Sequence, residues 1–269
     1  MDQAALPFAL SHSWAILLLP LLSFVINGIW VCHKSHRYSA LISTLLSGAA
    51  FVWALVAAWQ WWTITSFNPE LYPNHTLIAW NFKWLTIGAL SSSAPLTIGM
   101  GGLFDPISVM MLVVVTTIAF LVHIYSVGYM EGDPSKGRFF PLLSLFAFAM
   151  QGMVASTNIL QMYFFWELVG VSSYQLIGFW YHKPSAVAAS KKAFIVTRFA
   201  DAFFLLGIVL VSYVVGHLDF SVLNSPTSAE MLNREIGLGF LTVNALSAGT
   251  ILIFTGGWGK SAMFPMHIW

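Results

Sequence analysis

The sequence predicts an all-α membrane protein that crosses the bilayer about seven times, and three observations support this class. Of 269 residues, 58% are hydrophobic and only 8% are charged, whereas soluble domains carry about 25% charged residues. The mean hydropathy is +0.79. Uncharged runs of about 20 residues, the length that spans a bilayer, recur along the whole chain. The formal net charge of +1 gives no indication of a nucleic-acid partner.

Cysteine usage limits the cofactors that this chain can hold. Cys32 is the single cysteine in the sequence, so an internal disulfide is excluded. Without a C-x-x-C motif, the sequence also argues against a cysteine-bound iron–sulfur cluster or zinc site. We therefore expect no metal and no redox cofactor in this chain, and any electron carriers in partner subunits.

The first three predicted spans cover about residues 13–32, 38–62 and 106–129. A signal peptide does not explain the first span, because the basic residues follow it instead of preceding it. Tryptophans at the end of the second span suit the membrane interface. Between the second and third spans, segments 82–87 and 95–99 flank a Gly- and Ser-containing stretch, which predicts a hairpin outside the membrane.

The later spans are separated by polar segments. Residues 139–181 contain one charge and are too long for a single helix, so Ser156-Thr157-Asn158 is predicted to turn the chain between a fourth and a fifth span. A loop at 182–192 precedes the sixth span, about 193–215. A polar connection at 216–237 precedes the seventh, about 240–269. The predicted organisation is therefore residues 1–104 (two helices and the external loop), 105–138 (third helix and loop) and 139–269 (helices four to seven).

Loop charge predicts the orientation in the membrane, since lysine and arginine concentrate on the cytoplasmic side. The loops after spans one, three and five hold seven such residues, namely Lys34, Arg37, Lys136, Arg138, Lys183, Lys191 and Lys192. The loops after spans two, four and six hold two, namely Lys83 and Arg234. We expect the N-terminus outside and the basic loops in the cytoplasm or an equivalent compartment of an energy-transducing membrane.

Charged residues inside the apolar spans are the candidate functional residues, because a carboxylate at bilayer depth costs several kcal/mol and normally has a partner. Glu167 and Asp201 each lie about eight residues, or ~12 Å, from the boundary at which their spans enter. In a core of ~30 Å both are therefore near mid-depth. Arg198 and Asp201 are three residues apart and share a helix face. Two interpretations stay open: a self-neutralising structural pair, or a pair that exchanges partners during proton transfer.

Lys260 lies in a glycine-rich stretch, Thr255-Gly-Gly-Trp-Gly-Lys-Ser-Ala262, with Pro265 shortly after it. Glycines and a proline in a span predict a broken helix, and interrupted helices at mid-membrane mark ion paths in transporters. A desolvated lysine can accept and donate a proton. The alternative is a lysine whose ammonium group extends to the membrane interface.

Weaker candidates for a proton relay are His123 in the third span, His267 after the predicted break, and Lys192 near the start of the sixth span. Histidine titrates near pH 6.5, which suits proton transfer. A hydrogen-bonded histidine with only a packing role is the alternative for both histidines, and a cytoplasmic anchor is the alternative for Lys192.

Several motifs resemble those of a known family, and together they cover nearly all of residues 100–269. They are Phe104-Asp-Pro-Ile-Ser108, His123-Ile-Tyr-Ser-Val-Gly-Tyr-Met130, Phe165-Trp-Glu-Leu-Val-Gly-Val-Ser-Ser-Tyr174, Lys192-Ala-Phe-Ile-Val-Thr-Arg198 and Gly259-Lys-Ser-Ala262. In these motifs the chain resembles the N-terminal portion of the largest antiporter-like subunit (subunit L, or chain 5) of respiratory complex I, the proton-pumping NADH:quinone oxidoreductase.

The resemblance implies both a fold and a function. Glu167 would be the channel glutamate, Lys260 the broken-helix lysine, and Arg198 with Asp201 the charged pair between them. The family fold has two inverted five-helix repeats, of which the first would be incomplete here. The implied function is proton translocation driven by NADH:quinone electron transfer, with flavin, iron–sulfur clusters and quinone in partner subunits. The implied partners of this chain are other membrane subunits of complex I, especially neighbouring antiporter-like subunits. A subunit of a sodium/proton antiporter and a subunit of an inorganic-carbon uptake complex remain alternatives.

Overall fold

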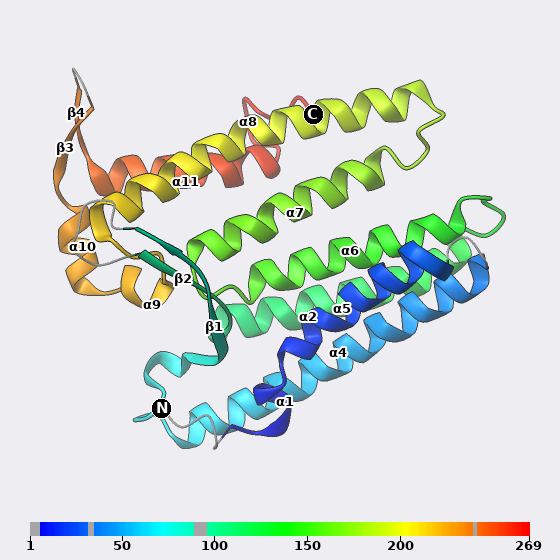
Figure 1. Cartoon of the computed structure of the whole chain (residues 1–269), viewed down its shortest axis with the longest axis horizontal. Helices are drawn as coiled ribbons and strands as arrows, with labels where there is room; N and C mark the ends of the chain where they lie inside the picture. Colours follow the sequence, from blue (N-terminus) through cyan, green and yellow to red (C-terminus); the bar gives the residue numbers. More distant parts are fainter. Residues whose placement is uncertain (1–5, 32–34, 89–95, 239–240) are drawn as a thin grey trace. The chain divides into compact units, whose positions relative to one another are not determined.

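The computed structural model describes residues 6–31, 35–88, 96–238 and 241–269 (Figure 1). Cys32, the serines of the predicted hairpin turn at 91–93, and the predicted start of the seventh span at Phe240 lie outside the described residues. The chain divides into two compact units, Met1–Asn81 with Gly101–Ser156, and Phe82–Met100 with Thr157–Trp269. Each unit is described in turn.

Helices make up most of the first unit. They are α1 (Phe8–Ser11), α2 (Trp14–Ile26) with a π-helical continuation at Asn27–Val31, α4 (His36–Phe67), α5 (Pro106–Tyr129) and α6 (Lys136–Val154). The longer four confirm the first four predicted spans.

The start of α5 follows directly from its sequence. The Asp105 side chain accepts a hydrogen bond from the Ser108 amide at 2.6 Å, and the Ser108 hydroxyl accepts one from the Asp105 amide at 2.8 Å. This is a capping box, and Pro106 adds a fixed φ at the first helical position. The observed helix therefore has the predicted bounds.

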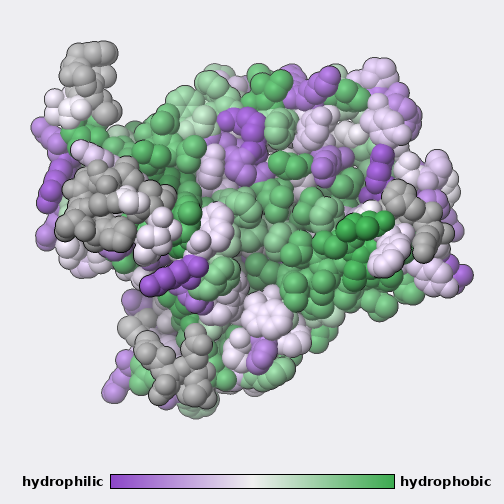
Figure 2. All heavy atoms as spheres, viewed as in Figure 1, coloured by the Kyte–Doolittle hydropathy of each residue, from purple (hydrophilic) through white to green (hydrophobic). Residues whose placement is uncertain are grey.

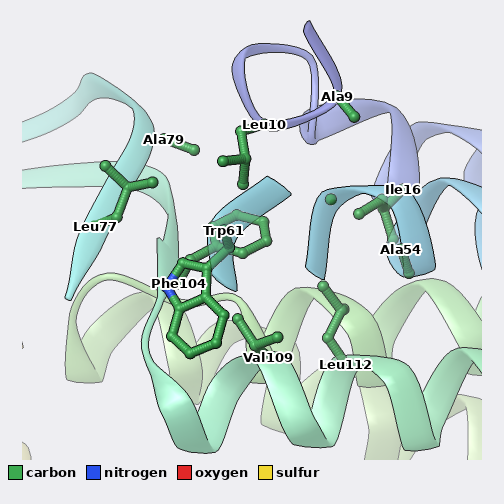
Figure 3. Close-up of a cluster of buried hydrophobic side chains, with 11 residues drawn as sticks. Ala9, Leu10, Ile16, Ala54, Trp61, Leu77, Ala79, Phe104, Val109 and Leu112 are labelled. Carbon is green, nitrogen blue, oxygen red and sulfur yellow. The ribbon is translucent and has the colours of Figure 1, made fainter. Parts of the chain in front are cut away.

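Apolar side chains from α1, α2, α4, α5 and the first hairpin form the core of the first unit (Figure 3). Trp61 and Phe104 contribute large rings, which are 5% and 2% exposed. Val109 and Leu112 extend from α5 toward them (Figure 3). This core holds α1, α2, α4, α5 and the hairpin residues together.

The predicted hairpin is confirmed, and it is longer than expected. Its strands are β1 (Leu77–Ile87) and β2 (Leu96–Phe104), which pair in a two-stranded sheet. A 3₁₀ turn at Pro73–His75 precedes it. Its location outside the membrane stays a prediction.

The second unit contains three long helices and a second hairpin. Its elements are α7 (Ile159–Ile177), α8 (Pro184–Val215), α9 (Phe220–Leu223), α10 (Pro226–Leu232), β3 (Glu235–Leu238), β4 (Leu241–Asn244) and α11 (Ala245–Lys260). Strands β3 and β4 are antiparallel. Helix α11 packs along α8 (Figure 1). The predicted turn at residues 156–158 is confirmed, since the Asn158 side chain accepts from the Gln161 amide at 2.8 Å and begins α7.

Two boundary predictions in the second unit were wrong. Helix α8 begins at Pro184, so Lys191 and Lys192 lie in the helix and not in a loop. The connection begins after Val215 as predicted and contains two short helices and β3. The described residues of the predicted seventh span begin with β4, and its helix starts only at Ala245. Hydropathy alone does not separate a short apolar strand from the first turn of an apolar helix. The glycines of α11 also do not break it, because the helix passes through them and ends at Lys260.

Five described helices have the length and apolar composition to cross a membrane: Trp14–Val31, His36–Phe67, Pro106–Tyr129, Lys136–Val154 and Pro184–Val215. The other two predicted spans correspond to α7, with 19 residues, and α11, with 16 residues. At 1.5 Å per residue these measure about 28 and 24 Å. Hydrophobic side chains cover much of the face seen in Figure 2. The protein is therefore a polytopic membrane protein.

Candidate functional site

The candidate site lies in the second unit and consists of four ionisable side chains, Glu167, Arg198, Asp201 and Lys260, which we call the charged cluster. They come from three helices: Glu167 from α7, Arg198 and Asp201 from α8, and Lys260 from the last position of α11. The structure brings all four together, as the sequence predicted.

Asp201 is the centre of the charged cluster. Its side chain is 1% exposed, and one carboxylate oxygen, Oδ2, lies 3.1 Å from Arg198 Nη2 and 3.7 Å from Lys260 Nζ. The predicted contact across three residues of α8 is therefore present. A buried carboxylate needs compensation by charge or hydrogen bonds, and here two cations share it.

Arg198 connects the two carboxylates. Its guanidinium pairs with Glu167 through Nη1 and with Asp201 through Nη2. The side chains of Arg198 and Glu167 are 25% and 27% exposed, so this pair is less enclosed than Asp201. Because a guanidinium offers five N–H donors in a planar fork, it can bind both carboxylates at once.

Trp166 connects α7 to the other members, and the sequence analysis assigned it no role. Its indole N–H donates to Asp201 Oδ1 at 2.6 Å. Its main-chain carbonyl accepts from Lys260 Nζ, and the ammonium lies 4.6 Å from the ring centroid. One signal was available in the sequence: Trp166 precedes Glu167 in an apolar helix, where a buried indole N–H requires an acceptor.

Small residues allow α11 to approach closely enough for Lys260 to reach Asp201. A Cβ on Gly259 would overlap the side chain of Ala200, and one on Gly256 would lie 2.7 Å from Phe204 Cβ. A Cβ on Gly170 would meet the Arg198 guanidinium. Side chains at these positions would separate the helices, so Gly256 and Gly259, two of the three glycines that suggested a broken helix, act in packing.

The end of α11 also suits a cation. Lys260 is the last helical residue, and the following residues are irregular. The unsatisfied carbonyl groups at a helix C-terminus favour positive charge. The predicted break therefore lies directly after Lys260, and its side chain is only 15% exposed.

The predicted relay residues differ in their surroundings. His267 is exposed, and its ring lies 5.6 Å from that of Phe264. Lys192 is exposed on α8, and among the described residues no ion pair includes it. His123 lies in the first unit, where it is fully buried. The structure therefore does not bring Lys192 or His267 into the charged cluster.

The chemistry available to the charged cluster is proton exchange. When all four groups are ionised, two positive charges balance two negative ones. Lysine and the carboxyl groups can gain or lose a proton, whereas arginine stays charged. Among the described residues, no group of three or more His, Cys, Asp or Glu side chains is arranged to hold a metal ion.

Comparisons with known proteins match the part of the chain that contains these four residues. The family model described as "NADH:quinone oxidoreductase/Mrp antiporter, TM" matches residues 156–269, which contain the whole charged cluster. The model described as "NADH-Ubiquinone oxidoreductase (complex I), chain 5 N-terminus" matches residues 84–140. The chain belongs to this family of antiporter-like membrane subunits.

Named relatives support the family assignment. The NAD(P)H-quinone oxidoreductase chain 5 of Synechocystis sp. is 36% identical over 96% of this chain, which covers 36% of that protein. The chloroplastic subunit 5 of Zygnema circumcarinatum is 37% identical over 96% of this chain, which covers 35% of that protein. The chain thus spans about a third of the length of the curated relatives that it matches.

A solved structure has the same fold. It is that of the membrane-bound sulfane sulfur reductase, an archaeal respiratory membrane complex, and one of its chains superposes with a TM-score of 0.72 at 18% identity. The match covers 96% of this chain and 46% of that chain. At this identity it supports the fold alone.

Proposed function

We propose that this chain belongs to a proton-translocating membrane subunit of an NAD(P)H-quinone oxidoreductase, with the charged cluster as its proton-exchanging site. The observation that carries the proposal is the sharing of one buried carboxylate, Asp201, between Arg198 and Lys260. A fixed structural pair would need only one cation for that carboxylate. Two competing cations allow the pairing to change when one of them loses its charge.

The coupling follows from the contacts. When Lys260 releases its proton, Asp201 loses one of its two cations and attracts Arg198 more strongly. Arg198 also pairs with Glu167, so a shift of the guanidinium toward Asp201 leaves Glu167 without a counterion and favours proton uptake there. Proton release at Lys260 is thereby linked to proton uptake at Glu167 through Asp201 and Arg198.

Energy for this cycle would come from partner subunits. Flavin, iron–sulfur clusters and quinone are expected there, and neighbouring antiporter-like subunits are expected to contact this chain. The lysine and arginine distribution supports an N-terminus outside and basic loops inside an energy-transducing membrane. Fluorescent tags on the N-terminus and on the loop after α5, tested with an impermeant quencher on intact cells, would check this orientation.

The central experiment is purification of the complex that contains this chain, followed by reconstitution into vesicles. Addition of NADH or NADPH with a quinone should acidify the vesicle interior. The Glu167→Gln variant should retain electron transfer and lose acidification. A complex without redox subunits, or acidification unchanged by the variant, would contradict the proposal.

A sodium/proton antiporter subunit is the second candidate function, since the family model over residues 156–269 includes Mrp antiporters in its description. The two functions differ in their energy source. An antiporter would move protons when a sodium gradient is imposed on vesicles without any electron donor, and a redox-driven pump would not.

A further inference from the structure

A second buried polar network lies in the first unit, which the proposed mechanism does not use. It joins Ser23 of α2, Asn27 of the π-helical segment, Ser43 of α4, His123 of α5 and Ser144 of α6. Four of the five side chains are 0% exposed, and Ser144 is 1% exposed. Polar groups at this depth are costly unless they are hydrogen-bonded, so a connected network from four helices calls for an explanation.

The network is a continuous chain of hydrogen bonds that ends at His123. The distances are 2.8 Å from Asn27 Nδ2 to Ser43 Oγ, 2.9 Å from Ser23 Oγ to Ser43 Oγ and 2.8 Å from Ser23 Oγ to Ser144 Oγ. His123 Nε2 lies 3.3 Å from Ser144 Oγ. Three hydroxyl groups in series therefore connect Ser43 to the imidazole ring.

The tautomer of His123 follows from its other contact. Its Nδ1 lies 2.7 Å from the Ala119 carbonyl, which only accepts hydrogen bonds, so Nδ1 carries a hydrogen. In the neutral ring Nε2 is then an acceptor, which faces the Ser144 hydroxyl. This is the nitrogen that takes up a proton when the ring becomes charged.

The rest of the surroundings of His123 offer no other proton route among the described residues. The ring lies beside Phe140 and an apolar pocket of α5 and α6, lined by Val122, Leu143 and Phe146. Neither an acidic nor a basic side chain of the described residues forms an ion pair or hydrogen bond with it. Proton exchange at Nε2 therefore depends on Ser144.

A second observation points to an unused acceptor in the network. Asn27 Oδ1 is buried and has no hydrogen-bond partner among the described groups. Rotation of the amide by 180° exchanges Oδ1 with Nδ2, so that the carbonyl oxygen faces Ser43. Asn27 also begins a π-helical segment, a feature that occurs frequently at functional sites. The network can thus adopt two hydrogen-bond arrangements.

The other end of the route reaches an exposed residue. On α4, one turn before Ser43, the Ser39 hydroxyl donates to the Gly137 carbonyl at 2.9 Å. The Gly137 amide donates to His36 Nδ1 at 3.1 Å, and His36 is exposed at the start of α4. Four residues of helix separate Ser39 from Ser43, a rise of about 6 Å, so this step of the route requires a bridging water molecule.

We propose that His123 is a second proton-binding site, loaded from the start of α4 through Ser39, Ser43, Ser23 and Ser144. An incoming proton binds Ser43, which passes its own proton to Ser23; Ser23 passes one to Ser144, and Ser144 passes one to His123 Nε2. Each hydroxyl breaks one O–H bond and forms another, and the added charge ends on the imidazolium. Before uptake, Ser43 donates to Ser23, Ser23 to Ser144 and Ser144 to His123. After uptake, Ser144 donates toward Ser23, Ser23 toward Ser43 as it does in the structure, and Ser43 toward the rotated Asn27 carbonyl. Release reverses these steps.

Proton binding at His123 does not depend on the proposed function, but a part for it in pumping rests on that function. The experiment therefore has a spectroscopic arm and a pumping arm, both on the reconstituted complex. Infrared difference spectra with ring-labelled histidine follow protonation over a titration that extends well into the acidic range. The His123→Gln variant identifies the His123 band.

Matched variants test the route. Threonine and valine have nearly the same shape, so Ser144→Thr retains the hydroxyl and Ser144→Val removes it at equal size. Thr116→Val is the control, because the buried Thr116 hydroxyl on α5 bonds, among the described residues, only to the Leu112 and Val113 carbonyls. Ser144→Val should slow protonation of His123 about tenfold or more, while Ser144→Thr and Thr116→Val should match the wild type.

The outcomes test proton binding at His123 separately from the proposed pumping function. A His123 band that does not titrate, or equal rates in Ser144→Val and Ser144→Thr, would overturn the proposal. If Ser144→Val does not assemble, Ser43→Ala interrupts the same route at an earlier hydroxyl, with the same expected slowing. A band shifted by sodium ions and not by pH would mean a cation site instead. A wild-type complex that fails to pump would refute the proposed function and leave the spectroscopic result decisive for His123.

Discussion

At the scale of single residues, Asp201 is the residue on which the contacts of the charged cluster converge. It is the most enclosed of the four ionisable side chains and contacts Arg198, Lys260 and Trp166. Removal of one partner of a buried ion pair leaves an uncompensated charge and costs about 3–5 kcal/mol. Substitutions at the partners of Asp201 are therefore more informative than substitutions of Asp201 itself.

Glu167→Gln should abolish or severely reduce proton pumping and leave assembly largely intact. Glutamine keeps the shape of glutamate and can still accept a hydrogen bond from Arg198, but it cannot carry the charge or take up a proton. Acidification of reconstituted vesicles, measured per electron transferred, checks this. Normal acidification in the variant would exclude Glu167 from the proton route.

Lys260→Ala should stop pumping, and Lys260→Arg should be impaired although the charge is retained. Arginine does not release its proton in proteins, so an arginine at this position can neutralise Asp201 but cannot pass a proton on. Comparison of pumping rates in the two variants distinguishes a lysine that carries protons from a lysine that only supplies positive charge. A native rate for Lys260→Arg would show that Lys260 is a fixed countercharge.

Trp166→Phe should reduce pumping and shift its pH profile, because it removes the indole N–H that donates to Asp201 at 2.6 Å. A hydrogen bond to a charged group contributes about 1.5–3 kcal/mol, which corresponds to roughly a tenfold or larger change in a coupled equilibrium. Trp258→Phe is the matched control, since the Trp258 indole nitrogen on α11 is buried without a partner among the described groups. Equal pH profiles for the two variants would contradict a positioning role for Trp166.

At the scale of elements, the close packing of α11 on α8 brings Lys260 to Asp201. Gly259→Ala places a methyl group against Ala200 and should displace the end of α11, which weakens or removes the 3.7 Å contact between Lys260 and Asp201. Gly257→Ala is the control, because a Cβ there meets no described atom within 4 Å. We expect Gly259→Ala to lose most of its pumping and Gly257→Ala to retain it. Proton flux in vesicles and thermal unfolding in detergent measure both effects.

The connection after α8 carries a pH-dependent contribution to stability. Burial raises the pKa of the Asp219 carboxyl above 3.8, although His217 partly opposes the shift. A raised folded-state pKa means that this contribution is fully present below about pH 4 and is lost as the pH rises through the folded value. Asp219→Asn should therefore raise the unfolding midpoint near neutral pH, with the difference from the wild type disappearing at acidic pH. A difference that does not change with pH would contradict this account.

At the scale of the whole molecule, sequence patterns predicted what depends on local chemistry. Long apolar runs, the Asp105–Pro106 start of α5 and the Asn158 turn indicated helices that the structure contains. The three-residue spacing of Arg198 and Asp201 predicted their contact, since helical geometry fixes it. These features need no information about distant parts of the chain.

Features that depend on packing between helices were not predictable in the same way. Trp166 and Lys260 are separated by 94 residues and meet only because α7, α8 and α11 pack together. The glycines of α11 were interpreted as helix breakers, because composition does not distinguish a break from close contact. The serine network around His123 has no sequence signature, since single serines on three helices look like isolated polar residues.

The length of α11 carries a constraint of its own. Asn244 caps one end of this helix, the Ala245 amide is held by the Arg234 carbonyl at 2.8 Å, and Lys260 stands at the other end. Each inserted or deleted residue would turn Lys260 by about 100° around the helix axis. A single deletion in the apolar middle of α11, with every charged residue intact, would therefore rotate the ammonium away from Asp201. The number of residues between the second hairpin and Lys260 thus specifies the site as strictly as the identity of the lysine.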